Sequence, residues 1–171
     1  MVDVPHSPAP TQEPHWLTDD QQRVWRSWLR GTSQIENYMA QQLRPHGLDL
    51  AEYEILVELS EAPERECRMS HLADGVHQSR SRLTHTVTRL EKAGLVTRRR
   101  CKGDGRGVWA TLTDEGMALL EAVAPSHVQA VRDVFIDVVD PDDFAAIGRA
   151  MEAVLALDVE VEKRLPPGGR R

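Results

Sequence analysis

The sequence predicts a mainly α-helical protein with one small β-hairpin. Over most of the chain, apolar residues recur every three or four positions, which is the period of helices that bury one face. Residues 108–113 instead alternate apolar and polar side chains, as half-buried strands do. Lysine and arginine are concentrated in one segment, residues 77–106. These three observations set the fold class and indicate which segment is functional.

The basic segment stands out against an acidic chain. Residues 77–106 contain nine Lys or Arg and two acidic residues, in a protein of 171 residues with a formal net charge of −6. The rest of the chain therefore carries −13. A local concentration of positive charge within an acidic protein is typical of a surface that binds nucleic acid.

A helix is expected to begin after Ser79 within this segment. Leu83, Val87 and Leu90 follow at helical spacing and share one face, so that face should be buried. Ser79 suits the N-cap and Gly94 the C-terminal cap. The opposite face lacks acidic residues, which favours a polyanionic partner. It consists of Gln78, Ser81, Arg82, His85, Arg89 and Lys92, with Thr84 and Thr88 at its edges.

The segments on either side of this helix predict a helix-turn-helix followed by a wing. Residues 69–76 are expected to form a short helix capped by Ser70, joined to the basic helix by a tight turn. Residues 95–102 and 108–113 are expected to form two short strands. The glycine-rich connection between the strands suits a hairpin tip and presents Arg106 there.

Three motifs in this region resemble the MarR family of transcriptional regulators. They are LEKAGLVTR at residues 90–98, DGRGV at 104–108 and LTDEG at 112–116. The family pattern is L-E-x-x-G-L-V-x-R, a D-x-R wing and L-T-x-x-G, and the resemblance covers about residues 18–165. It implies a dimeric winged helix-turn-helix regulator, often a repressor, that binds double-stranded DNA. Thr86 departs from the pattern, because the family usually has an aliphatic residue there.

The expected DNA contacts follow from the charge pattern of residues 77–106 and from the resemblance to the MarR family. We expect the basic helix to enter the major groove and Arg106 to reach the minor groove or its phosphates. The resemblance implies that Asp104 orients Arg106 or pairs with Arg98. The residues expected at the DNA-binding surface are Ser70, Ser79, Arg80, Ser81, Arg82, Thr84, His85, Arg89, Lys92, Arg98, Arg100, Asp104 and Arg106.

Helix-capping residues and loop-forming residues divide the rest of the chain into predicted regions. Thr18 with Gln21 predicts a helix that runs to about Arg44, and Asp49 with Glu52 predicts the next one. Ala62–Arg68 is expected to be a loop. The expected regions are a disordered arm (1–16), a dimerisation helix (17–48), the winged helix-turn-helix (49–113), C-terminal dimerisation helices (114–165) and a flexible tail (166–171).

The C-terminal region should contain two helices. Thr113 caps the first, and Pro125 should kink it or mark a break. Asp140 followed by Pro141 predicts the start of the last helix. Its apolar stripe requires a cover, either from the first helix of the same chain or, as the resemblance favours, from a second copy. The residues expected at the dimer interface are Trp25, Trp28, Phe144, Ile147, Met151, Val154, Val161 and Leu165.

The resemblance also implies a small effector, often an aromatic acid or a drug. Trp25, Trp28 and Tyr53 are candidate ligand-binding residues, although the tryptophans suit core or dimer packing equally. We predict no cofactor and no enzyme activity, because the sequence contains neither a Gly-rich phosphate loop nor a nucleophile elbow. It also contains no apolar run long enough to span a membrane, so a soluble cytoplasmic protein is expected.

Two alternative functions remain open. A winged helix that binds proteins should expose apolar anchors, whereas the basic helix exposes Arg82 and His85. A metal- or redox-responsive regulator is the other alternative, with basic neighbours favouring the thiolate of Cys101. No metal site is predicted, because the spacing of the candidate ligands fits no tight zinc pattern. Those ligands are His71, His77, His85, Cys67 and Cys101.

Overall fold

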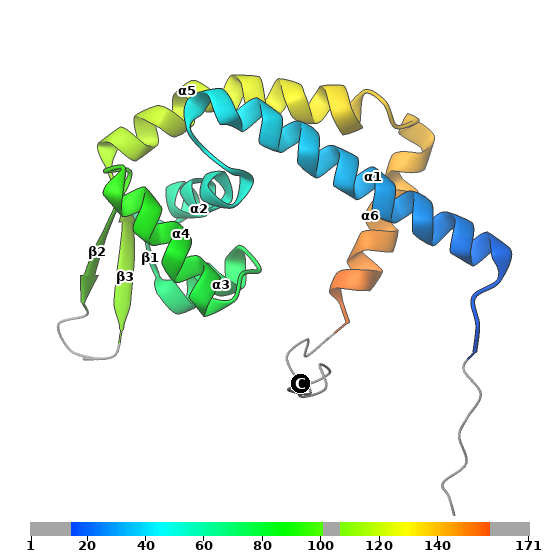
Figure 1. Ribbon diagram of the computed structural model, residues 1–171, viewed down its shortest axis with the longest axis horizontal. Helices are drawn as coiled ribbons and strands as arrows, with labels where there is room; N and C mark the ends of the chain where they lie inside the picture. Colours follow the sequence, from blue (N-terminus) through cyan, green and yellow to red (C-terminus); the bar gives the residue numbers. More distant parts are fainter. Residues whose placement is uncertain (1–14, 101–106, 158–171) are drawn as a thin grey trace, which may run out of the picture.

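The protein is mainly helical, with a three-stranded antiparallel sheet (Figure 1). The structure is a computed structural model that describes residues 15–100 and 107–157. This arrangement confirms the predicted fold class. The elements in chain order are α1 (Asp19–Leu43), η1 (Arg44–His46), α2 (Leu50–Glu61), η2 (Pro63–Arg65), β1 (Glu66–Arg68), α3 (Met69–Gly75), α4 (Arg80–Lys92), β2 (Val96–Arg100), β3 (Val108–Leu112), α5 (Asp114–Val131), η3 (Arg132–Ile136) and α6 (Pro141–Leu155).

The predicted helix starts are confirmed at five positions, which are the starts of α1, α2, α4, α5 and α6. Thr18 and Gln21 form a capping box at α1, and Asp49 and Glu52 form another at α2. In each box the N-cap side chain accepts from a backbone N–H that the helix leaves without a partner, and the third helical residue returns a bond to the N-cap. At α6 the Asp140 side chain accepts from the N–H of Asp142. These caps fix where the long helices begin.

Two local predictions were wrong. Ala62–Arg68 is not simply a loop, because Glu66–Arg68 forms β1 and pairs with β3. Three residues, two of them charged, contain no alternation from which a strand could be predicted. The N-cap of α3 is Arg68 rather than Ser70, and no side chain caps that helix.

The sheet has the strand order β1-β3-β2, with both pairs antiparallel. Its connection to α5 accounts for the L-T-x-x-G motif. The Thr113 hydroxyl donates to the Gly94 carbonyl at 2.8 Å and accepts from the Gly116 N–H at 3.0 Å. A Cβ at Gly116 would lie 2.2 Å from the Leu95 carbonyl oxygen. Only glycine therefore lets α5 start so close to the strand β2.

Pro125 does not interrupt α5. The helix continues to Val131 and curves over the winged region (Figure 1). The irregular turn lies farther along, where η3 forms a π-helix between α5 and α6. Of the two outcomes expected at Pro125, a kink or a break, the break is absent, and a π-helix follows Val131 instead.

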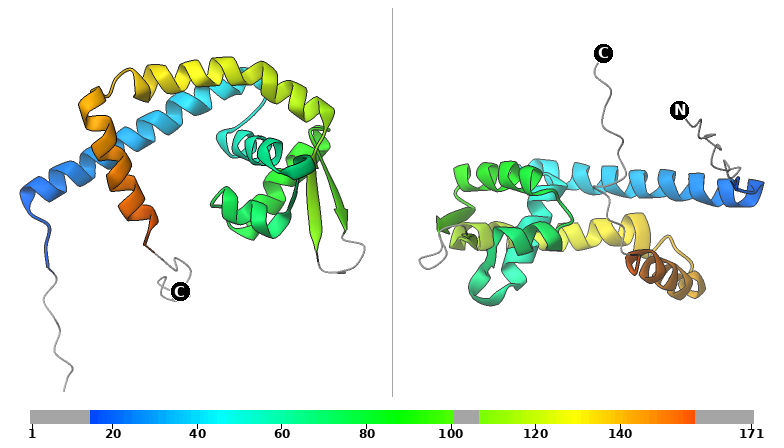
Figure 2. Two further views of the ribbon diagram at one scale, coloured as in Figure 1. Left: turned by 180° about the vertical axis from the view of Figure 1, so that it is seen from behind. Right: turned by 90° about the horizontal axis from the view of Figure 1, so that it is seen from below.

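The hydrophobic core lies in the winged region, whereas the terminal helices are largely uncovered. α1 runs beside α5 and extends well past the winged region (Figures 1 and 2). Only Met39 and Leu43 of α1 are buried, and α6 buries no residue. Within residues 15–100 and 107–157, no helix is long enough and apolar enough to cross a membrane. The core consists of Leu43, Leu48, Tyr53, Ile55, Leu56, Leu59, Leu72, Ala73, Leu83, Val87, Leu90, Val96, Ala110, Leu112, Leu120 and Val123.

Candidate nucleic-acid interface

Helix α4 displays the predicted polar face. Ser79 is its N-cap, with the side chain accepting from the Arg82 N–H at 3.3 Å. Leu83, Val87 and Leu90 are at most 1% exposed and anchor the opposite face in the core. The polar face is therefore held outward by packing. Its exposed residues are Arg80, Ser81, Arg82, Thr84, His85, Arg89 and Lys92, and none of them is acidic.

Three threonines of α4 use their hydroxyl protons within the helix. Thr84 donates to the Arg80 carbonyl at 2.8 Å, and Thr88 donates to the Thr84 carbonyl at 2.7 Å. Thr86 is 3% exposed and donates to the Arg82 carbonyl at 3.1 Å. This bond satisfies its hydroxyl in an apolar site and explains how threonine replaces the usual aliphatic residue. The exposed Thr84 retains an acceptor and a methyl group for a partner.

Arg89 is held by α2. Its Nε donates to Glu52 Oε1 at 2.8 Å, and its Nη2 donates to Asp49. The hydrogen bond to Glu52 raises the pKa of Arg89. The same two acids form the capping box of α2, so each carboxylate serves both purposes. The pairing of Arg89 with these two acids could not be predicted from the sequence. The capping-box pattern at Asp49 and Glu52 involves only neighbouring residues and does not indicate a partner on another helix.

The arginines of β2 also lie against carboxylates. Arg98 binds Glu91 of α4 through two nitrogens, with the Nε–Oε2 distance at 3.1 Å. This bond lowers the pKa of Glu91. Arg99 binds both oxygens of Glu66 of β1, at 2.7 and 2.8 Å. Arg98, which was expected to reach DNA or to pair with Asp104, binds α4 through Glu91, whereas Asp104 lies outside the described residues.

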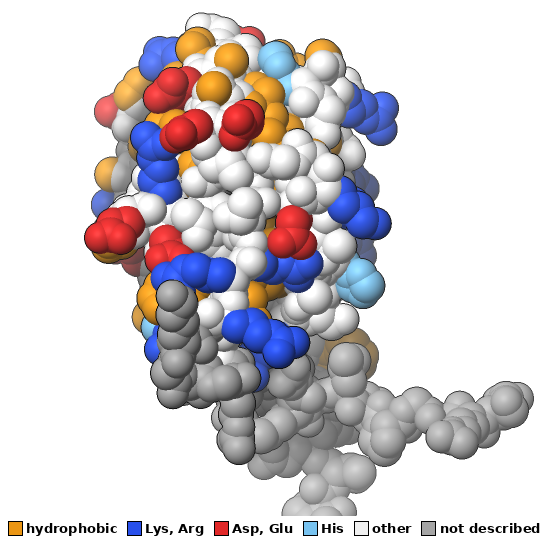
Figure 3. Space-filling view, turned by 90° about the vertical axis from the view of Figure 1, so that its left-hand side faces the viewer, with side chains coloured by type: hydrophobic (Ala, Val, Ile, Leu, Met, Phe, Trp, Pro, Cys, Tyr) orange, Lys and Arg blue, Asp and Glu red, His pale blue; other side chains and the backbone are white. Residues whose placement is uncertain are grey.

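The basic side chains gather toward the wing end. Figure 3 shows the face formed by the wing strands, where the charged side chains nearest that end are mostly Lys and Arg. Arg100 is exposed at the end of β2, and Ser70 is exposed at the start of α3. Asp104 and Arg106, both predicted to act at the wing tip, lie outside the described residues, as do Cys101, Val161 and Leu165.

The three candidate ligand-binding residues are not brought together. Tyr53 is 7% exposed, and its ring centroid lies 4.1 Å from that of His127 of α5. Burial raises the pKa of Tyr53 and lowers that of His127. Trp25 and Trp28 instead lie along the exposed part of α1, with 53% and 41% of their surfaces accessible.

The candidate metal ligands are also dispersed. Across the two described stretches, no three His, Cys, Asp or Glu side chains lie close enough together to hold a metal ion. Cys67 is half-buried and unbonded to another cysteine, and its pKa is raised chiefly by burial. A raised pKa favours the protonated thiol, which is less nucleophilic than the thiolate.

Comparisons with known proteins agree with this geometry. A family model described as MarR family matches residues 46–107. AbsC, a MarR family regulator from Streptomyces coelicolor, is 42% identical, with a TM-score of 0.79 over 83% of this chain and 96% of AbsC. Sco3205 from the same organism, solved in complex with DNA, is also 42% identical, with a TM-score of 0.79 over 82% of this chain and 92% of Sco3205.

A curated relative covers a shorter stretch. The regulator PecS from Dickeya dadantii is 40% identical over 65 residues, which is 38% of this chain and 39% of PecS. Relatives of this kind are transcriptional regulators rather than enzymes, in agreement with the sequence-based expectation. Given the motifs, the winged fold and the match over nearly all of AbsC, the chain belongs to the MarR family of DNA-binding, winged-helix transcriptional regulators.

Proposed function

We propose that the protein is a cytoplasmic repressor that binds a palindromic DNA site as a homodimer. The observation that carries the proposal is the acid-free, exposed face of α4, which is held outward by three buried aliphatic residues. An α-helix fits the major groove of B-DNA, where guanidinium and imidazole groups reach base edges. Arg82 and His85 are the side chains we assign to base edges.

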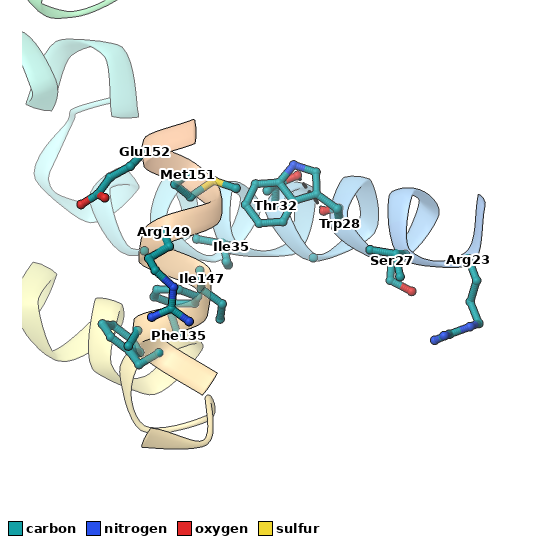
Figure 4. Close-up of a pocket in the computed structure, with 15 residues that line it drawn as sticks. Arg23, Ser27, Trp28, Thr32, Ile35, Phe135, Ile147, Arg149, Met151 and Glu152 are labelled. Carbon is teal, nitrogen blue, oxygen red and sulfur yellow. Dashed lines mark hydrogen bonds between the residues drawn. The ribbon is translucent and has the colours of Figure 1, made fainter. Parts of the chain in front are cut away.

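The uncovered terminal helices support dimerisation. A groove of about 1020 Å³ lies between α1, η3 and α6, with Trp28, Ile35, Phe135, Ile147 and Met151 along it (Figure 4). α6 has 15 residues and buries none of them in one chain, whereas a helix of this length needs tertiary packing to be stable in water. A second copy supplies the same apolar faces by two-fold symmetry and would cover them.

The dimer matters for DNA binding because it sets the distance between two copies of α4. Half-sites should then repeat roughly 34–36 Å apart, which is one turn of the double helix. The second contact becomes intramolecular, which strengthens binding about 10²–10⁴-fold without new contacts.

A pair of matched variants tests this architecture. Ile147→Glu places a charge in the groove, whereas Ala153→Glu adds the same charge to α6 outside the groove lining. We expect Ile147→Glu to sediment as a monomer and bind single half-sites weakly, while Ala153→Glu stays dimeric. Cutting the chain after Val139 should have the same effect as Ile147→Glu. A full-length monomer that binds one half-site as tightly as the palindrome would rule the dimer out.

Selection from random duplex DNA tests the repressor's specificity directly. We expect the recovered sequences to share an inverted repeat, and Arg82→Ala to lose that preference. Recovery of unrelated sequences with equal affinity would exclude sequence-specific binding.

Release of DNA by a small aromatic acid extends the proposal. Its support is the cluster of Tyr53, His127, Gln42 and Ser126, where α1, α2 and α5 meet between the groove and the winged region. Salicylate titrated into a gel shift is the first probe. An unchanged shift at millimolar salicylate, together with intact DNA binding, would remove salicylate as an effector and leave the DNA-binding proposal standing.

A further inference from the structure

Gln78 carries the one enclosed polar side-chain atom in the described part of the chain that has no hydrogen-bond partner. It ends the turn between α3 and α4, directly before the N-cap Ser79. Helical period predicts that Gln78 lies on the exposed face of α4, yet its side chain is half-buried. Its Oε1 accepts no hydrogen bond from residues 15–100 or 107–157. An amide that was expected to point outward therefore has its oxygen inside the protein.

The unpaired oxygen lowers the stability of the folded protein. A buried carbonyl oxygen loses its hydrogen bonds to water on folding, and here it gains none in return. The two methylene groups of the side chain offset part of this loss, because they leave water as well. Methionine has a similar length and would bury an apolar side chain without burying an amide. Stability therefore does not account for glutamine at this position, and departures of this kind are expected where a residue serves binding.

The backbone of the turn is held in place, so only the side chain needs to move for the amide to reach the exposed face. The N–H of His77 donates to the Asp74 carbonyl at 3.3 Å. The N–H of Gln78 donates to the Ala73 carbonyl at 3.0 Å. Rotation about the side-chain bonds of Gln78 leaves both hydrogen bonds intact. The amide would then lie beside the first turn of α4, and residues at that end of a recognition helix are the ones that contact base edges.

We propose that Gln78 turns outward when DNA binds and pairs with an adenine in the major groove. The edge of adenine offers its N6 amino group as a donor and N7 as an acceptor, so it satisfies the oxygen and the nitrogen of the amide together. Guanine offers two acceptors at that edge and would leave the glutamine oxygen without a partner. The inference rests on the proposed function and adds a base contact to those assigned to Arg82 and His85.

The first experiment tests whether the amide is unpaired in the folded protein. Gln78→Met removes the amide and keeps the length of the side chain, and Gln41→Met is the matched control, because Gln41 is exposed on α1. Urea unfolding of the full chain without DNA is followed by tryptophan fluorescence. We expect the midpoint to rise by about 0.5 M in Gln78→Met and to stay unchanged in Gln41→Met. An unchanged or lower midpoint in Gln78→Met would mean that the amide is satisfied inside the fold and would overturn the inference.

The second experiment tests the base contact. Duplexes are selected from random DNA with the wild type and with Gln78→Met, and affinities for the selected palindrome and for a random duplex are measured by fluorescence anisotropy. We expect the wild type to require an A·T pair at one position of each half-site where Gln78→Met accepts any base pair. Affinity for the selected palindrome should fall about tenfold in Gln78→Met, whereas affinity for the random duplex should stay unchanged.

A third experiment tests the pairing itself by replacing the adenine at this position with 7-deazaadenine, which lacks the N7 acceptor. The wild type should lose about fivefold in affinity, and Gln78→Met should lose nothing further. Independent effects of the base change and the protein change would overturn the inference. Equal weakening of Gln78→Met on every duplex would also overturn it, because Gln78 would then serve the shape of the turn rather than a base.

The same selections separate this inference from the proposed function. A wild type that selects no sequence overturns both. A wild type that selects a palindrome, together with Gln78→Met that selects the same palindrome with the same affinity, overturns only the assignment of Gln78.

Discussion

Replacing Arg89 with methionine should reduce the stability of the protein rather than remove a DNA contact. Arg89 was predicted to bind DNA, yet its Nε donates to Glu52 Oε1 at 2.8 Å and its Nη2 donates to Asp49. Because Asp49 and Glu52 also cap α2, the guanidinium braces α4 against the start of that helix. Methionine keeps the apolar stem of the side chain and removes the charge and the donors.

The exposures of the three side chains set the size of the effect. Arg89 and Asp49 are 54% and 51% exposed, so their pair is close to a surface ion pair, worth about 0–1 kcal/mol. Glu52 is 11% exposed, and losing a charge-assisted bond to a buried carboxylate costs about 1.5–3 kcal/mol before screening by solvent. Allowing for the exposed Arg89, we expect a loss of about 2 kcal/mol. With an m-value of about 2 kcal/mol/M, the urea midpoint should fall by roughly 1 M.

Urea unfolding followed by tryptophan fluorescence measures this loss. Arg80→Met is the matched control, because Arg80 is exposed on the same helix. In a double-mutant cycle with Glu52→Gln, the two changes should cost much less together than the sum of their separate costs. The reasoning is refuted if Arg89→Met keeps the wild-type midpoint and instead makes the salt slope of DNA binding shallower by about one per protomer.

Three further predictions follow from other parts of the molecule. Arg82→Ala should cost about 1–3 kcal/mol on the preferred site and relax discrimination at one base position, whereas equal weakening on every duplex would make Arg82 a phosphate contact. Arg106→Ala should weaken binding and make the salt slope shallower by about one, and unchanged affinity at fixed salt would exclude the wing from the DNA. Burial lowers the pKa of His127 below about 6.5, so the unfolded chain takes up a proton more readily and stability falls as pH drops below about 6.5. When the urea midpoint is measured as a function of pH, His127→Asn should reduce its fall below about pH 6.5. The same fall in His127→Asn as in the wild type would contradict the role of His127.

Features confined to four or five neighbouring residues could be predicted from the sequence. The capping boxes at Thr18 and Asp49 and the cap at Asp140 were found where they were expected, because a cap is made by residues at most three positions apart. The buried stripe of α4 followed from helical period alone. The wing strands β2 and β3 were recognisable because they join through a glycine-rich connection.

Features made by distant residues could not be predicted in this way. The strand β1 exists because Cys67 lies opposite Ala110, 43 positions along the chain, and nothing within residues 66–68 indicates that pairing. The partner of Arg89 is Glu52, 37 positions away. A helical wheel shows that Arg89 points outward, but it does not show which other helix it meets there. Helical period therefore predicts which face of α4 is exposed, but not that Arg89 on this face pairs with Glu52 of another helix.

The pairing of arginines with carboxylates inside the protein limits how strongly DNA binding depends on salt. Nine Lys and Arg residues lie in residues 77–106, so a dimer that placed all of them on phosphates would have a salt slope of about −16. Arg89, Arg98 and Arg99 are instead bound to carboxylates within the chain. Six of these nine cations per protomer are then left, and even if each met a phosphate the slope would be only about −11. We therefore expect a measured slope no steeper than about −11 on the palindrome. A steeper slope would mean that these three arginines exchange their carboxylates for phosphates when DNA binds, and Arg89→Met would then lower it.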